Sequence, residues 1–359
     1  MAHSSFLIAA GFFLLAIGAE LFVKGASTIA RRLGVTPLLI GLTVVALGTS
    51  LPEVAITAMS AVKNTPSLAL GNIVGSNIAN LLMIGGCAAI TGAITLNRTT
   101  LHFHAPTMVG ITALVYLLGL NGYISRLEGV LLLLGFILYL TLTITIENNS
   151  FSERSDETTS PNPQSGIRYM IASGSLVGAG LLLLLVGSDW LVSGATELAK
   201  QWGVSDLVIG LTIVALGTSL PELATSVVAT ARGEGELALG NIIGSNISNL
   251  LLVLGIGATT SGSIEVNPKI STWDLPILLL VTVLSLLIFR SVRHIRRGTG
   301  FVLVFLYGVY LIHAALDSVE SPYESVFSWM LTLLIVLLAF FFAVRMKYRL
   351  PTSSSDVTN

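Results

Sequence analysis

The sequence has few charged residues and almost no cysteine. Only 10% of its 359 residues are charged, whereas soluble domains carry roughly 25%, so a soluble globular fold is excluded. A single cysteine, Cys87, has no partner within the chain and lies in an apolar run, which excludes a disulfide framework and argues against a catalytic thiol. The net charge of −1 gives no basis for nucleic-acid binding.

Apolar residues make up 53% of the chain, and the mean hydropathy is +0.87. Runs long enough to cross a hydrocarbon core, which takes roughly 20 residues, predict an all-α polytopic membrane protein rather than a barrel of short strands. We predict eleven spans, at residues 5–24, 37–62, 68–92, 105–121, 127–146, 169–192, 206–230, 236–258, 274–290, 300–316 and 325–344.

Lys and Arg fall mainly into alternate loops between these spans. Fourteen of the eighteen lie on one side, among them Arg98, Arg232 and the group from Arg290 to Arg297. Because positive loops stay in the cytoplasm, the bias predicts an N-terminus outside and a cytoplasmic C-terminus in a plasma membrane, with the bacterial inner membrane favoured. The basic loop 290–297 is interpreted as a topology signal.

The chain contains an internal repeat with an offset of 169 residues. "GLTVVALGTSLPE" at 41–53 returns as "GLTIVALGTSLPE" at 210–222, and "GNIVGSNIANLL" at 71–82 returns as "GNIIGSNISNLL" at 240–251. Over residues 41–86, 27 of 46 positions are identical to those 169 residues later. Each half holds five predicted spans, so the second half must enter the membrane from the opposite side, which is typical of secondary transporters.

The repeat divides the chain into five parts. The first repeat covers 5–146 and the inverted second repeat 169–316. A polar segment rich in Ser, Thr and Pro at 147–168 is expected to be a flexible cytoplasmic linker. The extra C-terminal helix at 325–344 lies outside the repeat, and a cytoplasmic tail follows at 345–359.

Glu53 and Glu222 are the acidic residues placed deepest in predicted spans. Each lies about sixteen residues into its span, where a charge costs roughly 2.5–3.5 kcal/mol. A protonated glutamate that pairs with a neighbouring helix is the structural alternative, but its occurrence in both halves favours function. Pro52 and Pro221 should break their helices at "GTSLP" and free carbonyls at 46–48 and 215–217.

Hydroxyl and amide groups accompany the two carboxylates. Ser76 and Asn80 are four residues apart and so share a helix face, and Ser245 and Asn249 repeat this spacing; these side chains serve in packing, in ligand binding, or in both. The candidate metal-ligating residues are Glu53, Glu222, Thr49, Ser50, Thr218, Ser219, Ser76, Ser245, Asn80 and Asn249. An all-oxygen set with two negative charges suits a hard cation, and its irregular geometry suits Ca²⁺ better than Mg²⁺.

The charge of the site also predicts how transport is coupled. Two bare carboxylates cannot pass through a dehydrated, occluded state cheaply, so the carrier would change sides only when loaded. This predicts antiport of cations and argues against a channel. The substrates are then Ca²⁺ and Na⁺; no cofactor, no nucleic acid and no obligate protein partner is expected, and the surroundings are the lipid bilayer.

The paired "GTSLPE" and "GNI[VI]GSNI" phrases resemble the two alpha-repeats of the calcium/cation antiporter superfamily, in particular the prokaryotic members of the sodium/calcium exchanger family. The resemblance implies a ten-helix fold in which Na⁺ entry drives Ca²⁺ export. It implies Glu53 and Glu222 as central Ca²⁺ ligands, with the six hydroxyl residues completing calcium and sodium sites and Asn80 and Asn249 flanking them. Some relatives carry Asp at the position of Asn249, notably potassium-dependent exchangers and certain prokaryotic sodium/calcium exchangers, and the eleventh helix exceeds the ten-helix pattern.

Two alternatives remain at this point. A H⁺-driven or other cation antiporter would use the same scaffold, although the "GNxxE" phrase typical of proton/calcium exchangers is absent in place of "GTSLPE". An intramembrane hydrolase using Ser50 or Ser219 is remote, because no GxSxG elbow or Ser–Lys or Ser–His pairing occurs at membrane depth. His102 and His104 are interpreted as surface residues at a span edge and are left out of the site.

Overall fold

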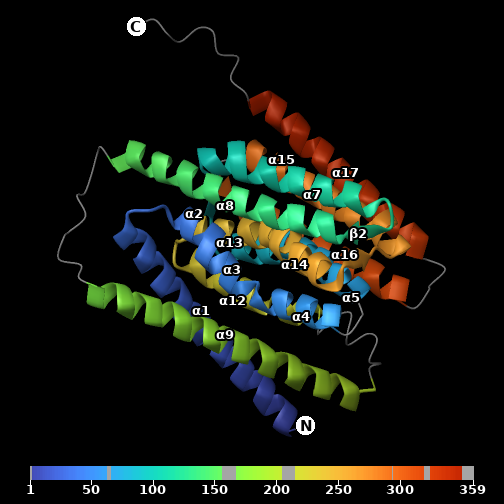
Figure 1. The fold of residues 1–359 in the computed structure, drawn as a ribbon, viewed down its shortest axis with the longest axis horizontal. Helices are drawn as coiled ribbons and strands as arrows, with labels where there is room; N and C mark the ends of the chain where they lie inside the picture. The colour runs from blue at the N-terminus through green and yellow to red at the C-terminus, as the bar shows by residue number, and fades with distance from the viewer. Residues whose placement is uncertain are drawn as a thin grey trace, which may run out of the picture.

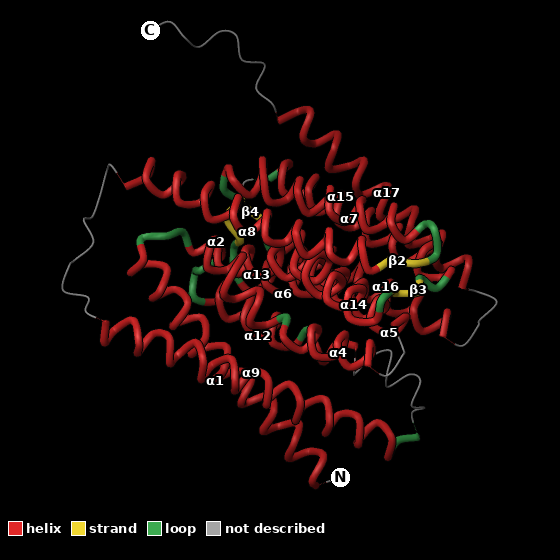
Figure 2. Tube along the Cα trace, in the orientation of Figure 1, coloured by secondary structure: helices red, strands yellow, loops and turns green. Residues whose placement is uncertain are grey.

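The computed structural model describes residues 2–62, 66–155, 167–203, 215–292, 294–318 and 324–349. Within them the chain is predominantly helical (Figures 1 and 2). Among the described residues, nine helices are long and apolar enough to cross a membrane, and the bent pair Pro37–Thr49 and Leu51–Ser60 adds a tenth if it is counted as one span. The predicted span 206–230 falls partly on residues 204–214, outside the described residues. The all-α membrane architecture is therefore confirmed.

The first half contains eight α-helices, three π-helical turns and two short strands. In chain order they are α1 (Ala2–Leu33), α2 (Pro37–Ile40), η1 (Gly41–Val45), α3 (Ala46–Thr49), α4 (Leu51–Val62), α5 (Pro66–Ala79), η2 (Asn80–Ile84), α6 (Gly85–Thr91), β1 (Ile94–Thr95), η3 (Thr100–His104), α7 (Ala105–Gly119), β2 (Tyr123–Ser125) and α8 (Arg126–Ser155).

The described part of the second half follows the same order and adds one helix. Its elements are α9 (Ile167–Gln201), α11 (Ala215–Thr218), α12 (Leu220–Ala231), α13 (Gly235–Ser248), η5 (Asn249–Val253), α14 (Leu254–Ser261), β3 (Ser263–Glu265), η6 (Ile270–Asp274), α15 (Leu275–Ser291), β4 (His294–Ile295), α16 (Arg297–Ser318) and α17 (Glu324–Arg349).

The "GSNI" helices form the centre of the bundle. Of the most apolar window in α13–η5–α14, 94% is buried inside the protein, against 78% for α5–η2–α6 and 22% for α9. Helix α13 crosses α2 and η1 of the other half at glycines: a Cβ added to Gly41 would lie 2.5 Å from the Leu237 carbonyl oxygen, and one on Gly240 2.6 Å from the Leu38 carbonyl oxygen. Glycine thus lets the two halves meet backbone to backbone.

Helices α1 and α9 run antiparallel along one side of the bundle (Figure 1). Glycines spaced by seven residues line their contact, and Gly18 and Gly180 meet at its centre. Both helices extend beyond the predicted spans, because the lysines and arginines expected in loops continue the helix as its last turns. The prediction that these residues begin a loop was wrong.

Gly180→Val is expected to weaken the contact between α1 and α9. A Cβ at this position would lie 2.5 Å from the Phe22 backbone nitrogen, which cannot move aside as a flexible side chain would. We expect a loss of stability of about 1–3 kcal/mol, measured as a lower melting temperature of the purified protein in detergent. Gly178→Val is the matched control, since a Cβ there meets nothing within 4 Å. Equal losses in both variants would contradict this account.

Two short sheets join loops of opposite halves. Strand β1 pairs antiparallel with β4, with Ile94 opposite Ile295, and β2 pairs antiparallel with β3, with Ile124 opposite Ile264. All four of these isoleucines are buried. By the predicted topology the first sheet lies on the cytoplasmic side and the second outside, so each end of the bundle is closed by one strand from each repeat.

The predicted linker and extra helix differ in detail from their expected form. Helix α8 continues to Ser155 and α9 begins at Ile167, so only residues 156–166 of the expected linker 147–168 lie outside both helices, and these are outside the described residues. Helix α17 packs against α15 and α16. Its Ser328 is buried and hydrogen-bonded to His313 at 3.0 Å.

Candidate cation site

The helix that carries the first "GTSLPE" phrase is broken, as its proline predicts. Segments Pro37–Thr49 and Leu51–Ser60 differ in direction by 42°. Pro52 has no N–H to donate to the Gly48 carbonyl, so the helix ends at Thr49 and resumes at Leu51. The second phrase breaks in the same way between α11 and α12, at Ser219.

The expected free carbonyls are only partly free. The Ser50 N–H donates to the Ala46 carbonyl at 3.0 Å, and the Thr49 hydroxyl donates to the Val45 carbonyl at 3.1 Å. In the second half, the Gly217 carbonyl that Pro221 leaves without a partner accepts from the Ser188 hydroxyl at 2.6 Å. Because local donors satisfy these carbonyls, the side chains supply most of the available oxygen atoms.

Each glutamate lies in the first turn of the helix that follows its break. Glu53 begins α4 and Glu222 begins α12, and each side chain is 1% exposed. A helix N-terminus carries partial positive charge, which favours a carboxylate at that position. No ion pair among the described residues involves either glutamate. The break therefore places two buried carboxylates, without a positive side chain, where backbone dipoles stabilise them.

The two halves contribute to one another's carboxylate. The Ser50 hydroxyl donates to Glu222 Oε1 at 3.4 Å across the pseudo-twofold relation. Thr218 of the second half and Ser76 of the first lie beside the Glu53 carboxylate. All ten residues proposed from the sequence are at most 8% exposed. The inverted repeat thus brings its two motif pairs into a single buried cluster.

Six of the ten proposed residues carry a buried oxygen atom with no hydrogen-bond partner in the structure. Buried polar groups are normally paired, so each such atom needs an explanation. In the described part of the chain, no three His, Cys, Asp or Glu side chains lie close enough together to hold a metal ion. The oxygen atoms available to a cation here are therefore chiefly carboxylate, hydroxyl and amide oxygens. The unpartnered atoms are Glu53 Oε2, Glu222 Oε2, Ser76 Oγ, Ser219 Oγ, Asn80 Oδ1 and Asn249 Oδ1.

The structure adds polar residues that the sequence argument did not select. The Asn241 side chain accepts from the Thr49 hydroxyl at 3.2 Å and donates to the Ser226 hydroxyl at 2.9 Å. Asn77 accepts from the Asn249 amide at 3.4 Å. The repeat contained a signal for Asn241, since it stands four residues before Ser245 and shares its helix face.

The helices carrying the candidate asparagines widen where those asparagines stand. A π-helical turn begins at Asn80 in the first half and at Asn249 in the second. Such turns change the local hydrogen-bond ladder and are frequent at functional sites. Their symmetric position places both amides at the point where the backbone departs from regular α-helix.

Glu20 takes part in a contact between the halves rather than in this cluster. Arg232, at the end of α12, forms an ion pair with Glu20 of α1, and Arg31 pairs with Glu234 at 3.0 Å. The equivalent acidic residue Asp189 is exposed. The ion pair with Arg232 gives Glu20 a role in fixing α1 against α12.

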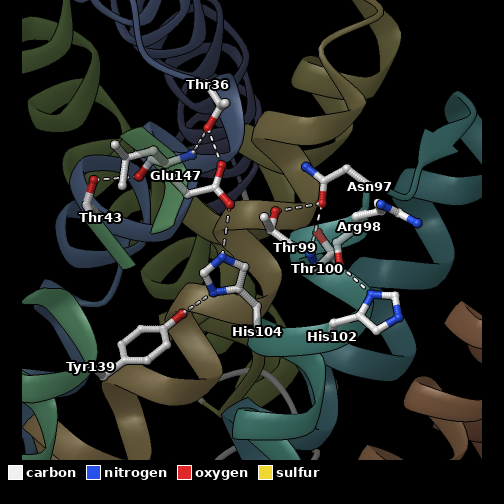
Figure 3. Close-up of polar contacts among 11 residues, drawn as sticks. Thr36, Thr43, Asn97, Arg98, Thr99, Thr100, His102, His104, Tyr139 and Glu147 are labelled. Atoms are coloured by element: carbon white, nitrogen blue, oxygen red, sulfur yellow. Dashed lines mark hydrogen bonds and ion pairs between the residues drawn. The ribbon is translucent and has the colours of Figure 1, made fainter. Parts of the chain in front are cut away.

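His104 is buried, contrary to its interpretation as a surface residue. Its ring is 0% exposed and is hydrogen-bonded to Glu147 Oε1 and to the Tyr139 hydroxyl, each at 3.2 Å (Figure 3). Glu147 Oε2 accepts from the Thr36 hydroxyl at 2.6 Å, and Thr36 also caps α2 by accepting from the Leu39 N–H. The π-turn η3 rotates His104 inward, which the sequence did not indicate. The cluster holds the start of α2 against α7 and α8.

Comparison with known proteins agrees with this architecture. The family model described as sodium/calcium exchanger protein matches residues 3–145 and 173–316, which is most of the chain. The chain belongs to the sodium/calcium exchanger family. All ten proposed site residues lie within the matched segments, and α17 lies outside them.

Similar exchanger-family proteins cover most of the chain. The putative antiporter CaxA of Alkalimonas amylolytica is 37% identical over 275 residues, covering 74% of this chain and 83% of that protein. The sodium/calcium exchanger MaX1 of Methanosarcina acetivorans is 30% identical over 302 residues, covering 75% of this chain and 86% of that protein. A structure of the sodium-calcium exchanger NCX_Mj soaked with Na⁺ and Sr²⁺ matches with a TM-score of 0.75 and 32% identity, covering 87% of this chain and 98% of that one.

Proposed function

We propose that the protein exports Ca²⁺ in exchange for Na⁺ by alternating access, with the cations bound at the cluster around Glu53 and Glu222. The observation that carries the proposal is the set of unpartnered buried oxygens around two carboxylates. Carboxylate, hydroxyl and amide oxygens are the ligands that Ca²⁺ takes, six to eight at a time and in flexible geometry. Thr49, Ser50, Thr218 and Ser245 would complete the calcium and sodium sites.

The uncompensated charge supports exchange rather than uniport. With no positive side chain paired to either glutamate among the described residues, the empty cluster holds up to two buried negative charges. One Ca²⁺ balances them, and so do two Na⁺. A loaded carrier can therefore cross the occluded state that an empty one cannot reach cheaply.

Asn80 and Asn249 support a carrier that needs no K⁺. Potassium-dependent relatives carry a carboxylate at the position of Asn249, whereas an amide provides oxygen without charge.

In the proposed orientation the protein lies in a bacterial inner membrane, with its N-terminus outside and its C-terminal tail in the cytoplasm, as the Lys and Arg bias indicates.

Gradient-driven uptake of radioactive Ca²⁺ into reconstituted vesicles tests the driving ion. We expect uptake when Na⁺-loaded vesicles are diluted into Na⁺-free medium, and no uptake when a pH gradient replaces the Na⁺ gradient. Protein-free vesicles report passive leak. Uptake that follows only the pH gradient would replace Na⁺ by H⁺ on the same scaffold, and uptake under neither gradient would contradict the proposed exchange.

A further inference from the structure

One cavity lies away from the cation site, where three spans end. It has a volume of about 880 Å³ and is lined by Val292, His294, Arg296, Gly298, Thr299, Val302, Phe342 and Arg345. These residues come from the end of α15, strand β4, the start of α16 and the last turns of α17. Cavities of this size lie within the range of small-molecule sites.

The walls of the cavity are amphipathic. Arg296, Arg345 and His294 supply the polar rim, and Val302 and Phe342 form an apolar wall. Phe342 and Arg345 are three residues apart and share one face of α17, with the arginine nearer the helix end. The cavity is thus basic at the level where the helices leave the membrane and apolar toward the membrane interior.

No acidic side chain is available nearby in the chain to neutralise this rim. The sequence contains no Asp or Glu from residue 275 to 316, nor from 325 to 355. Over the same stretches it contains Arg290, Arg293, Arg296 and Arg297, and then Arg345, Lys347 and Arg349. Among the residues whose side chains the structure describes, Arg290, Arg296, Arg297 and Arg345 take part in none of the ion pairs. The field at the cavity is therefore of one sign and attracts anions.

The loop that carries Arg296 is held in a fixed position. Strand β4 is paired with β1, and Ile295 is buried against the protein. The Arg297 side chain donates to the Ile90 carbonyl at 3.0 Å, which fixes the start of α16. The basic rim is consequently built on paired backbone rather than on a loose loop, and a ligand need not order it.

We propose that this cavity binds one anionic phospholipid, with its phosphate between Arg296 and Arg345 and an acyl chain along Val302 and Phe342. The basic rim of the cavity, at the ends of three spans, matches the charged headgroup of such a lipid, and the apolar wall below it matches the acyl chain. Basic pockets between transmembrane helices on the cytoplasmic side are known to take anionic headgroups. The proposal gives α17, which lies outside the matched family segments, a role as one wall of a lipid site.

Native mass spectrometry of the full-length protein in detergent tests the proposal. The protein is titrated separately with phosphatidylglycerol, phosphatidylcholine and inorganic phosphate, and bound adducts are counted. We expect one phosphatidylglycerol retained with high affinity, about thirtyfold weaker binding in R296Q/R345Q, and weak, mutation-independent binding of phosphatidylcholine.

Two further variants separate specific binding from general charge. K24Q removes an exposed lysine on the same predicted side, on α1, which supplies no residue to the cavity wall, and should bind like the wild type. R296K/R345K keeps the charge and should retain most of the affinity. Equal binding of phosphatidylglycerol by R296Q/R345Q and the wild type would overturn the site. Phosphate binding as tightly as the lipid would overturn the assignment to phospholipid.

Discussion

Glu53→Gln is expected to abolish Na⁺-driven Ca²⁺ uptake while the protein still folds in the membrane. The change preserves the size of the side chain but removes one of two buried negative charges that would balance Ca²⁺. It also places an N–H₂ where a ligand oxygen would stand. Loss of one partner of a buried charged interaction costs about 3–5 kcal/mol, which corresponds to at least a hundredfold weaker Ca²⁺ binding. Glu222→Gln should have the same effect, since the two halves are related by the repeat.

Vesicle flux and a folding control distinguish loss of binding from loss of protein. The variant should elute as a single species in size-exclusion chromatography and keep its helical circular dichroism. Glu265→Gln, at an exposed glutamate in β3, is the matched control and should transport like the wild type. Ca²⁺ uptake at the wild-type rate in both Glu53→Gln and Glu222→Gln would contradict the assignment of these carboxylates as ligands.

Much of the candidate site follows from the sequence because its signal is local and repeated. A glutamate after a proline in an apolar span is costly wherever the chain folds, so Glu53 and Glu222 stand out without a structure. The partners of each carboxylate are not local. That Ser50 reaches Glu222, and that Asn241 links Thr49 to Ser226, depends on how the halves cross at Gly41 and Gly240.

The fold was predicted to a similar depth. Hydropathy and the repeat indicated the helices, and the odd number of spans per half indicated inversion. The ends of helices were less predictable, because Lys24, Arg31 and Lys200 continue their helices out of the apolar region instead of ending them. The π-turns were invisible to a period of 3.6 residues. One of them, η3, places His104 on the inward face.

The buried His104–Glu147 pair leads to the second large expected effect, on stability. Neither side chain is exposed. Glu147, on α8, accepts from Thr36 just before α2, and His104, on η3, is hydrogen-bonded to Tyr139 on α8. In the second half, η6 ends at Asp274 as η3 ends at His104, and Asp274 accepts a hydrogen bond from the Tyr310 hydroxyl at 3.4 Å instead of joining a buried His–Glu pair. The pair therefore anchors the start of α2, and with it the helix leading to Glu53.

Glu147→Ala is expected to destabilise the protein by about 3–5 kcal/mol, because it leaves His104 and the Thr36 hydroxyl buried without their acceptor. His104→Ala should cost a similar amount, and H104A/E147A less than the sum of the two single losses, because both polar partners are then removed together. Melting temperatures of the purified variants in detergent measure this, with Glu128→Ala, another glutamate of α8, for comparison. A purely additive double variant would show that the two side chains do not act as a pair.

Since α2 leads into the helix that carries Glu53, residual protein from the single variants should also show a reduced maximal rate of Ca²⁺ uptake.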